Sequence, residues 1–259
     1  MFTLPIKVAN RVQAMLVMID AHVRNLEVFL PSLSTDFERA GAAGQLPIPA
    51  ARKAASALAL HDGEDFDLVV ALERSGFIVV EHALGSRHID AATLWSDGGR
   101  PIILLNIDSP KDRRRFTLAH EVAHLLMHSS PSEADEGDAD RFAAELLMPA
   151  ERIRSDFGNV SLASIERLRV KWRVPANALI GRARDLGAIG STDYRTLNID
   201  LARSGLKRSE SPFSGEHPTT MRTVAAKAFA DGRTIEGIAA MAMCSCDEFR
   251  ALYQIGVLP

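Results

Sequence analysis

The sequence predicts an α+β fold in which a short sheet lies beside helices. Between residues 77 and 106, three short apolar runs are separated by turn-forming residues, which is typical of strands. Most of the remaining chain carries apolar residues at helical spacing. The composition, with 47% hydrophobic and 24% charged residues in 259, is that of a globular protein able to bury a core.

Charge, cysteine content and the first residues exclude several classes of protein. The net charge of −3 argues against nucleic-acid binding through bulk charge. The two cysteines, Cys244 and Cys246, form no disulfide framework, which favours a reducing compartment. The apolar stretch near the start is interrupted by Asp20, so it predicts an amphipathic helix, not a signal peptide or membrane span. We therefore expect a cytoplasmic protein.

The first 106 residues are predicted to form helices followed by strands. Periodic apolar residues predict helices, and the Gly/Ala/Pro-rich segment between them predicts a linker or an irregular lead-in to the next helix. The expected helices cover residues 5–30, 51–60 and 66–75, and the linker covers 41–50. The expected strands cover residues 77–80, 91–95 and 101–106, with a turn at Gly98–Gly99, and the last strand, PIILLN, is expected to be buried on both faces.

The rest of the chain is predicted to be helical. Ser109 and Pro110 are typical of a helix start, and this helix should run to about His128. A second helix should run from about Asp135 to Met148, where Pro149 follows. Further breaks are expected at Gly158, Pro175, Gly187–Gly190 and the Ser/Pro/Gly-rich linker 209–218.

One motif in the first of these helices carries chemistry. His120 and His124 are four residues apart, so both imidazoles lie on one helix face and can reach a single zinc ion. Glu121, next to the first histidine, can act as general base on a water held by the metal. This HExxH pattern predicts a metal site for peptide hydrolysis.

A hydrolytic zinc needs a third protein ligand, and the acidic segment downstream offers several. Glu136 and Asp140 share a face of the second helix, so Glu136 can bind the metal while Asp140 orients a ligating histidine. Glu133 and Asp138 stay open as alternative ligands. His128 lies on the same face as His124, but a fourth ligand would close the site, so we expect a structural role or a place at the rim.

Two further features have no assigned role at this point. Tyr194 and His88 are candidates for stabilising an oxyanion, without a feature that favours either. The segment 234–253 resembles a helix-turn-helix but lacks a dense basic recognition helix, so partner contacts are favoured over DNA binding.

The segments FTLAHEVAHLLMH and EGDADRFAAELLMP resemble the ImmA/IrrE metallopeptidases, whose site is gluzincin-like. FIVVEHAL, IDAATLW, RPIILLN and the segment at 168–189 are also similar, so the resemblance covers about residues 65–210. The resemblance implies Glu136 as the third ligand, and it implies a helix-turn-helix repressor as substrate. The family commonly has Asn where this chain has Asp140, and either side chain can accept a hydrogen bond.

Together these inferences predict a zinc-dependent endopeptidase that cleaves a helix-turn-helix repressor and so derepresses stress, phage or mobile-element genes. The ligands are His120, His124 and Glu136, and Mn²⁺ or another divalent ion would also suit them. The alternatives are a non-hydrolytic module that binds a repressor or DNA, and a zinc hydrolase acting on a small amide. The predicted domains are a helical segment at 1–45, a zincin-like peptidase domain at 46–150, a helix-turn-helix-like domain at 151–210, and a linker with a small helical module at 211–259.

Overall fold

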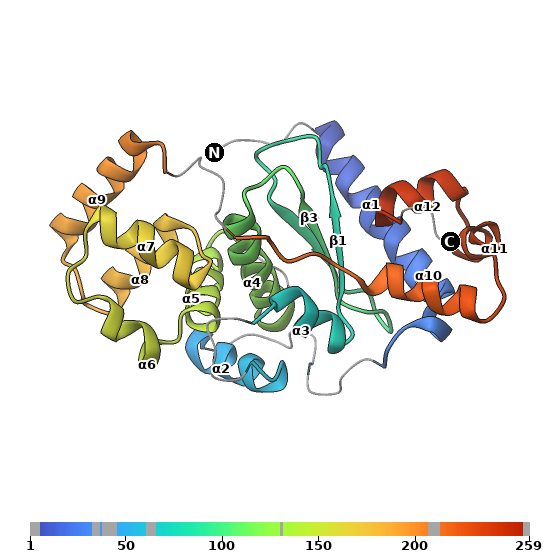
Figure 1. The fold of residues 1–259 in the computed structure, drawn as a ribbon, viewed down its shortest axis with the longest axis horizontal. Coiled ribbons are helices and arrows are strands. Elements are labelled where there is room, and N and C mark those ends of the chain that lie inside the picture. Colours follow the sequence, from blue (N-terminus) through green and yellow to red (C-terminus); the bar gives the residue numbers. More distant parts are fainter. Residues whose placement is uncertain are drawn as a thin grey trace. The chain divides into compact units, whose positions relative to one another are not determined.

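The protein is mixed α+β, as predicted, with a three-stranded sheet and helices before and after it in the described residues (Figure 1). A computed structural model describes residues 6–32, 37, 46–60, 66–129, 132–206 and 213–255. The chain divides into two compact units, of which the first comprises Met1–Phe37, Asp67–Asp108 and Glu216–Pro259 and the second comprises Glu38–Phe66 and Ser109–Gly215. The predicted domain boundaries, of which those at 45 and 210 fall outside the described residues, stay a prediction.

The sheet belongs to the first unit. Its strands are β1 (Ile78–His82), β2 (Ala91–Leu94) and β3 (Ile102–Asn106), in the order β1-β3-β2. β1 runs parallel to β3, and β2 runs antiparallel to it. Every residue of β3 is buried, as predicted for the apolar run PIILLN. Gly98 has a φ of 64°, in keeping with the predicted turn.

Helices from both ends of the chain cover one face of this sheet. Figure 1 shows α1 along the sheet, with α10 to α12 beside it. Alternate strand residues such as Val80 and Leu104 join one core with these helices. The helices of this unit are α1 (Ile6–Asn25), η1 (Glu27–Phe29), α3 (Leu68–Arg74), α10 (Thr220–Ala230), α11 (Ile235–Ala242) and α12 (Cys246–Tyr253).

The segment that resembles a helix-turn-helix forms α11, a short turn and α12. Met243 ends α11 in the left-handed region, and Ser245 caps α12 with its side chain. The first turn of α12 is acidic, with Asp247 and Glu248, and the apolar face of α12 is buried in the core of this unit. A helix with this charge is poorly suited to contact phosphates, which agrees with the preference for partner contacts over DNA.

A buried hydrogen bond joins the two ends of the first unit. His22 on α1 is 2% exposed, and its Nδ1 lies 2.9 Å from the hydroxyl of Tyr253 on α12. Burial lowers the pKa of His22, and this outweighs the Glu248 carboxylate, which raises the pKa. The folded state therefore disfavours the protonated imidazole.

We expect His22 to make stability depend on pH. The unfolded chain, with a histidine pKa of about 6.5, binds a proton that the folded chain resists. The contribution of His22 to the free energy of unfolding is therefore largest above that pH and falls as the pH decreases, by at most about 1.4 kcal/mol per pH unit. Urea unfolding of the metal-free protein at about pH 8 and about pH 5.5 measures the slope. His22→Asn, which keeps a hydrogen-bonding atom on Cγ, should flatten the slope, whereas exposed His88→Asn should leave it unchanged.

The second unit is helical and contains the HExxH motif. Within it, α4 packs against α2 and α5. Its helices are α2 (Pro47–Ala57), α4 (Lys111–Met127), α5 (Glu136–Leu147), α6 (Ala150–Ile153), η2 (Arg154–Asp156), α7 (Leu162–Trp172), α8 (Ala176–Asp185) and α9 (Ser191–Ser204). Of the linker predicted at 41–50, residues 41–45 lie outside the described residues, and the prediction is wrong for residues 47–50, because α2 already begins at Pro47. Proline has a fixed φ that suits the first helical position.

Among the described helices, none is both long and apolar enough to cross a membrane.

Candidate metal centre

Helix α4 carries the three HExxH residues next to its buried apolar face. Its apolar residues Leu118, Val122 and Leu125 are buried. The histidine face lies beside them, with the side chain of His120 16% exposed and that of His124 8% exposed. Because one helical turn separates the two histidines, both rings point to the same side of α4.

The metal-binding atoms of two helices converge at this face. His120 Nε2 and His124 Nε2 are 3.0 Å apart. Glu136, the first residue of α5, places its carboxylate oxygens 3.3 Å from Nε2 of His120 and 3.5 Å from Nε2 of His124. A tetrahedral ion about 2.0–2.1 Å from each donor requires donor separations of about 3.3 Å. The three side chains therefore fit a zinc ion.

This set is the one group of metal-binding side chains that the described residues bring together. Asp138, an alternative ligand on the sequence, instead forms an ion pair with Arg141 at 3.0 Å. Glu133 lies before α5, in the turn, and is exposed. The geometry therefore favours Glu136 over both.

A carboxylate contacts the first histidine. His120 Nδ1 donates a hydrogen bond to Oδ1 of Asp140, one turn after Glu136, at 2.9 Å. Burial lowers the pKa of His120, but the bond to Asp140 and the charges of Glu121, Asp140 and Glu136 outweigh burial, so that the pKa is raised. The contact is the one expected between Asp140 and a metal-binding histidine, and the part of Asp140 in orienting His120 stays a prediction.

The environment of His124 differs from that of His120. Burial, followed by the neighbouring His120, lowers the pKa of His124, which favours the neutral ring that a metal ligand requires. Its Nδ1 lies 2.9 Å from Nδ1 of His128. This contact was missed in the sequence, where the spacing of four residues showed only that the two rings share a helix face.

The residues considered for an oxyanion do not belong to this set. Tyr194 lies on α9, where the guanidinium of Arg184 packs 4.3 Å from the centre of its ring. His88 lies in the first unit, between β1 and β2. Both cysteines are free thiols outside the metal-binding group.

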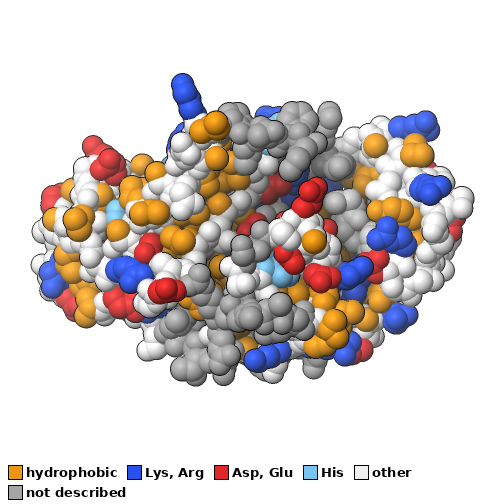
Figure 2. Space-filling view, turned by 180° about the vertical axis from the view of Figure 1, so that it is seen from behind, with side chains coloured by type: hydrophobic (Ala, Val, Ile, Leu, Met, Phe, Trp, Pro, Cys, Tyr) orange, Lys and Arg blue, Asp and Glu red, His pale blue; other side chains and the backbone are white. Residues whose placement is uncertain are grey.

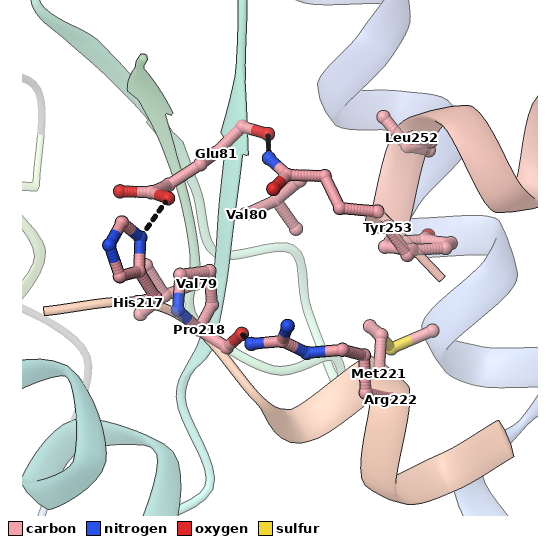
Figure 3. Close-up of a pocket in the computed structure, with 10 residues that line it drawn as sticks. Val79, Val80, Glu81, His217, Pro218, Met221, Arg222, Leu252 and Tyr253 are labelled. Atoms are coloured by element: carbon pink, nitrogen blue, oxygen red, sulfur yellow. Dashed lines mark hydrogen bonds and ion pairs between the residues drawn. The ribbon is translucent and has the colours of Figure 1, made fainter. Parts of the chain in front are cut away.

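A separate cavity of about 280 Å³ lies within the first unit, at the outer edge of β1 (Figure 3). Figure 3 shows the carboxylate of buried Glu81 facing the ring of His217, with Nδ1 at 3.0 Å. The Gln254 amide donates to the backbone carbonyl of Glu81 at 3.1 Å and so satisfies one acceptor of this sheet edge. None of the predicted site residues lines this cavity.

Residues 72–184 match the family model described as the IrrE N-terminal-like domain, which spans the HExxH motif, Glu136 and Asp140. This segment, less than half of the chain, is similar to the ImmA/IrrE metallopeptidases. The family match confirms the resemblance seen in the sequence and lies within the predicted coverage of about residues 65–210.

A curated relative of the family agrees with this match. The chain is 29% identical over 158 residues to the radiation response metalloprotease IrrE of Deinococcus deserti. The similar region covers 46% of this chain and 56% of the relative. The chain thus spans about half the length of the curated relative that it matches.

Proposed function

We propose that this protein is a zinc-dependent endopeptidase that cleaves a helix-turn-helix transcriptional repressor. The observation that carries the proposal is the triangle of donor atoms from His120, His124 and Glu136, with Glu121 adjacent in the helix. The family match over residues 72–184 and the metalloprotease relative support it.

Each residue has a separate part in the proposed reaction. His120, His124 and Glu136 would hold the ion, and Asp140 keeps His120 oriented. When bound, a divalent ion supplies Lewis acidity, which polarises a peptide carbonyl and lowers the pKa of water to near neutrality. The carboxylate of Glu121 takes a proton from the attacking water and delivers it to the departing amine nitrogen.

The repressor as substrate is inferred from the family resemblance, and the relative's name refers to a radiation response. We infer that cleavage of such a repressor releases stress, phage or mobile-element genes, and that it takes place in the cytoplasm, where repressors bind DNA. Figure 2 shows acidic and basic side chains interspersed over the described residues of the face in view. The net charge of −3 supports a protein partner over a nucleic acid, whose phosphates need a positively charged surface.

Incubation with a candidate repressor tests this function. The substrate is the repressor encoded beside the gene, and mass spectrometry of the products identifies the cleaved bond. We expect one or a few defined cleavages in the repressor. An intact repressor with wild-type gene induction in cells would instead support the non-hydrolytic binding module, and turnover of small amides alone would support the small-substrate hydrolase.

Removal of the metal gives a further expected result. A chelator followed by desalting should reduce cleavage to the level of buffer alone, because the donor set then holds no Lewis acid. Adding one equivalent of Zn²⁺ should restore the activity, and Mn²⁺ should restore part of it, since a His₂-carboxylate set also suits other divalent ions. Cleavage that persists in metal-free protein, verified by elemental analysis, would contradict a metal-dependent reaction.

A further inference from the structure

On the side of His124 opposite the donor triangle, its ring contacts His128, which in turn lies near Asp135. His128 stands at the end of α4, with its side chain 9% exposed and its ring centre 5.0 Å from that of His124. The two rings meet through their Nδ1 atoms, 2.9 Å apart. On the far side of His128, Nε2 lies 3.9 Å from Oδ1 of Asp135.

The tautomers of both rings follow from this geometry. If Nε2 of His124 binds a metal, its proton must be on Nδ1, and a buried N–H needs an acceptor. Among the described residues, the atom within hydrogen-bond distance is Nδ1 of His128, which accepts only if its own proton is on Nε2. That N–H then faces the carboxylate of Asp135, too far for a direct bond but close enough for charge attraction or a bridging water.

Asp135 is itself held in place. Its Oδ2 accepts hydrogen bonds from the backbone N–H of Ser132 at 2.8 Å and from the hydroxyl of Ser132 at 2.7 Å. These bonds fix the carboxylate on the side of Nε2 of His128. The charge fixes which nitrogen of His128 carries the proton.

We infer that His128 is a positioning residue, which accepts the Nδ1–H of His124 and holds that ring in the tautomer and orientation that bind the metal. His128 therefore has the same part for His124 that Asp140 has for His120. An imidazole suits this place because it accepts on one nitrogen while it donates from the other. The inference rests on the proposed zinc site.

The test is zinc affinity, measured at one fixed pH by competition with a chromophoric chelator. His128→Leu removes the acceptor, and we expect it to weaken zinc binding by about 10–100-fold, as loss of such partners does in other sites. His128→Asn should stay within about threefold of wild type, because its Oδ1 is attached to Cγ as Nδ1 is in histidine. Exposed His88→Leu is the matched control and should leave the affinity unchanged.

The visible absorption spectrum of the Co²⁺-loaded protein provides a second readout that does not depend on activity. We expect the spectrum of His128→Leu to differ from wild type and that of His128→Asn to match it. Should His128→Leu fail to fold, His128→Gln replaces it. The amide of glutamine is centred on Cδ, one bond beyond Cγ, so its oxygen is displaced from the position of Nδ1 and this variant should also lose zinc affinity.

Different results would contradict this inference and the proposed function. Wild-type zinc affinity and a wild-type Co²⁺ spectrum in His128→Leu, or in His128→Gln, would overturn the positioning part and leave the peptidase intact. A loss in His128→Asn as large as that in His128→Leu would overturn it too. A wild-type protein that binds no zinc would overturn both.

Discussion

Glu121→Gln should lower kcat for repressor cleavage by about 10²–10⁴-fold while zinc binding stays at the wild-type level. The carboxylate is the proton acceptor adjacent to the donor triangle, and an amide of the same shape cannot take a proton from water. Zinc binding should persist because the donor atoms belong to His120, His124 and Glu136. The affinity for uncleaved repressor should also persist, because the side chain keeps its size.

Single-turnover cleavage of the repressor, followed by mass spectrometry, measures the effect, and zinc content is measured on the same samples. Glu133→Gln is the matched control, since Glu133 is an exposed glutamate outside the donor set and should leave both quantities unchanged. Cleavage by Glu121→Gln within about tenfold of wild type would refute the general-base assignment. Gene induction by Glu121→Gln at the wild-type level would favour the binding module.

The candidate site could be predicted from sequence as far as it depends on spacing within a helix. His120, Glu121 and His124 follow from one helical turn, and Asp140 from its distance to Glu136. Whether Glu136 or Asp138 faces the histidines depends on how α5 packs against α4, which local periodicity does not determine. The same holds for His128, whose hydrogen-bond partner is visible only once both rings have orientations.

The fold shows a similar division. The apolar runs predicted all three strands, and the turn at Gly98–Gly99 lies where expected. The strand order was not predicted, because the apolar runs carry no signal for strand pairing. β1 pairs with β3, although β2 lies between them in the sequence. Nor could spacing show that α12 packs on α1, since His22 and Tyr253 are 231 residues apart in sequence. Such pairings depend on tertiary packing, which overrides local preference.

Buried charge is a further feature that sequence patterns do not reveal, and it leads to a large expected effect on stability. Glu145 is on α5, the helix that carries Glu136, and is only 3% exposed. Its carboxylate binds Arg182 of α8, which is 4% exposed, and Arg52 of α2 at 2.9 Å. Arg182 also donates to the backbone carbonyl of Met148 at 3.0 Å. The glutamate thus compensates a guanidinium that has almost no contact with solvent.

Glu145→Gln should lower the free energy of unfolding by about 3–5 kcal/mol, because it leaves the charge of Arg182 buried and uncompensated. The matched control is a substitution of Glu151, which also pairs with Arg52 but has a side chain that is 74% exposed. Solvent screens that pair, so Glu151→Gln should produce no measurable change. Urea unfolding of the metal-free proteins at neutral pH gives both values.

The double substitution Glu145→Leu with Arg182→Met distinguishes two causes of a loss in stability. One is a buried charge without a partner, and the other is the loss of the hydrogen bonds that the pair makes. Two apolar side chains of similar volume leave no buried charge, so the double variant should recover most of the stability that Glu145→Gln loses. Equal stability losses for Glu145→Gln and Glu151→Gln would show that the buried pair is no more important than the exposed one. A double variant as unstable as Glu145→Gln would show that α5 depends on the hydrogen bonds of the pair and not on its charge balance.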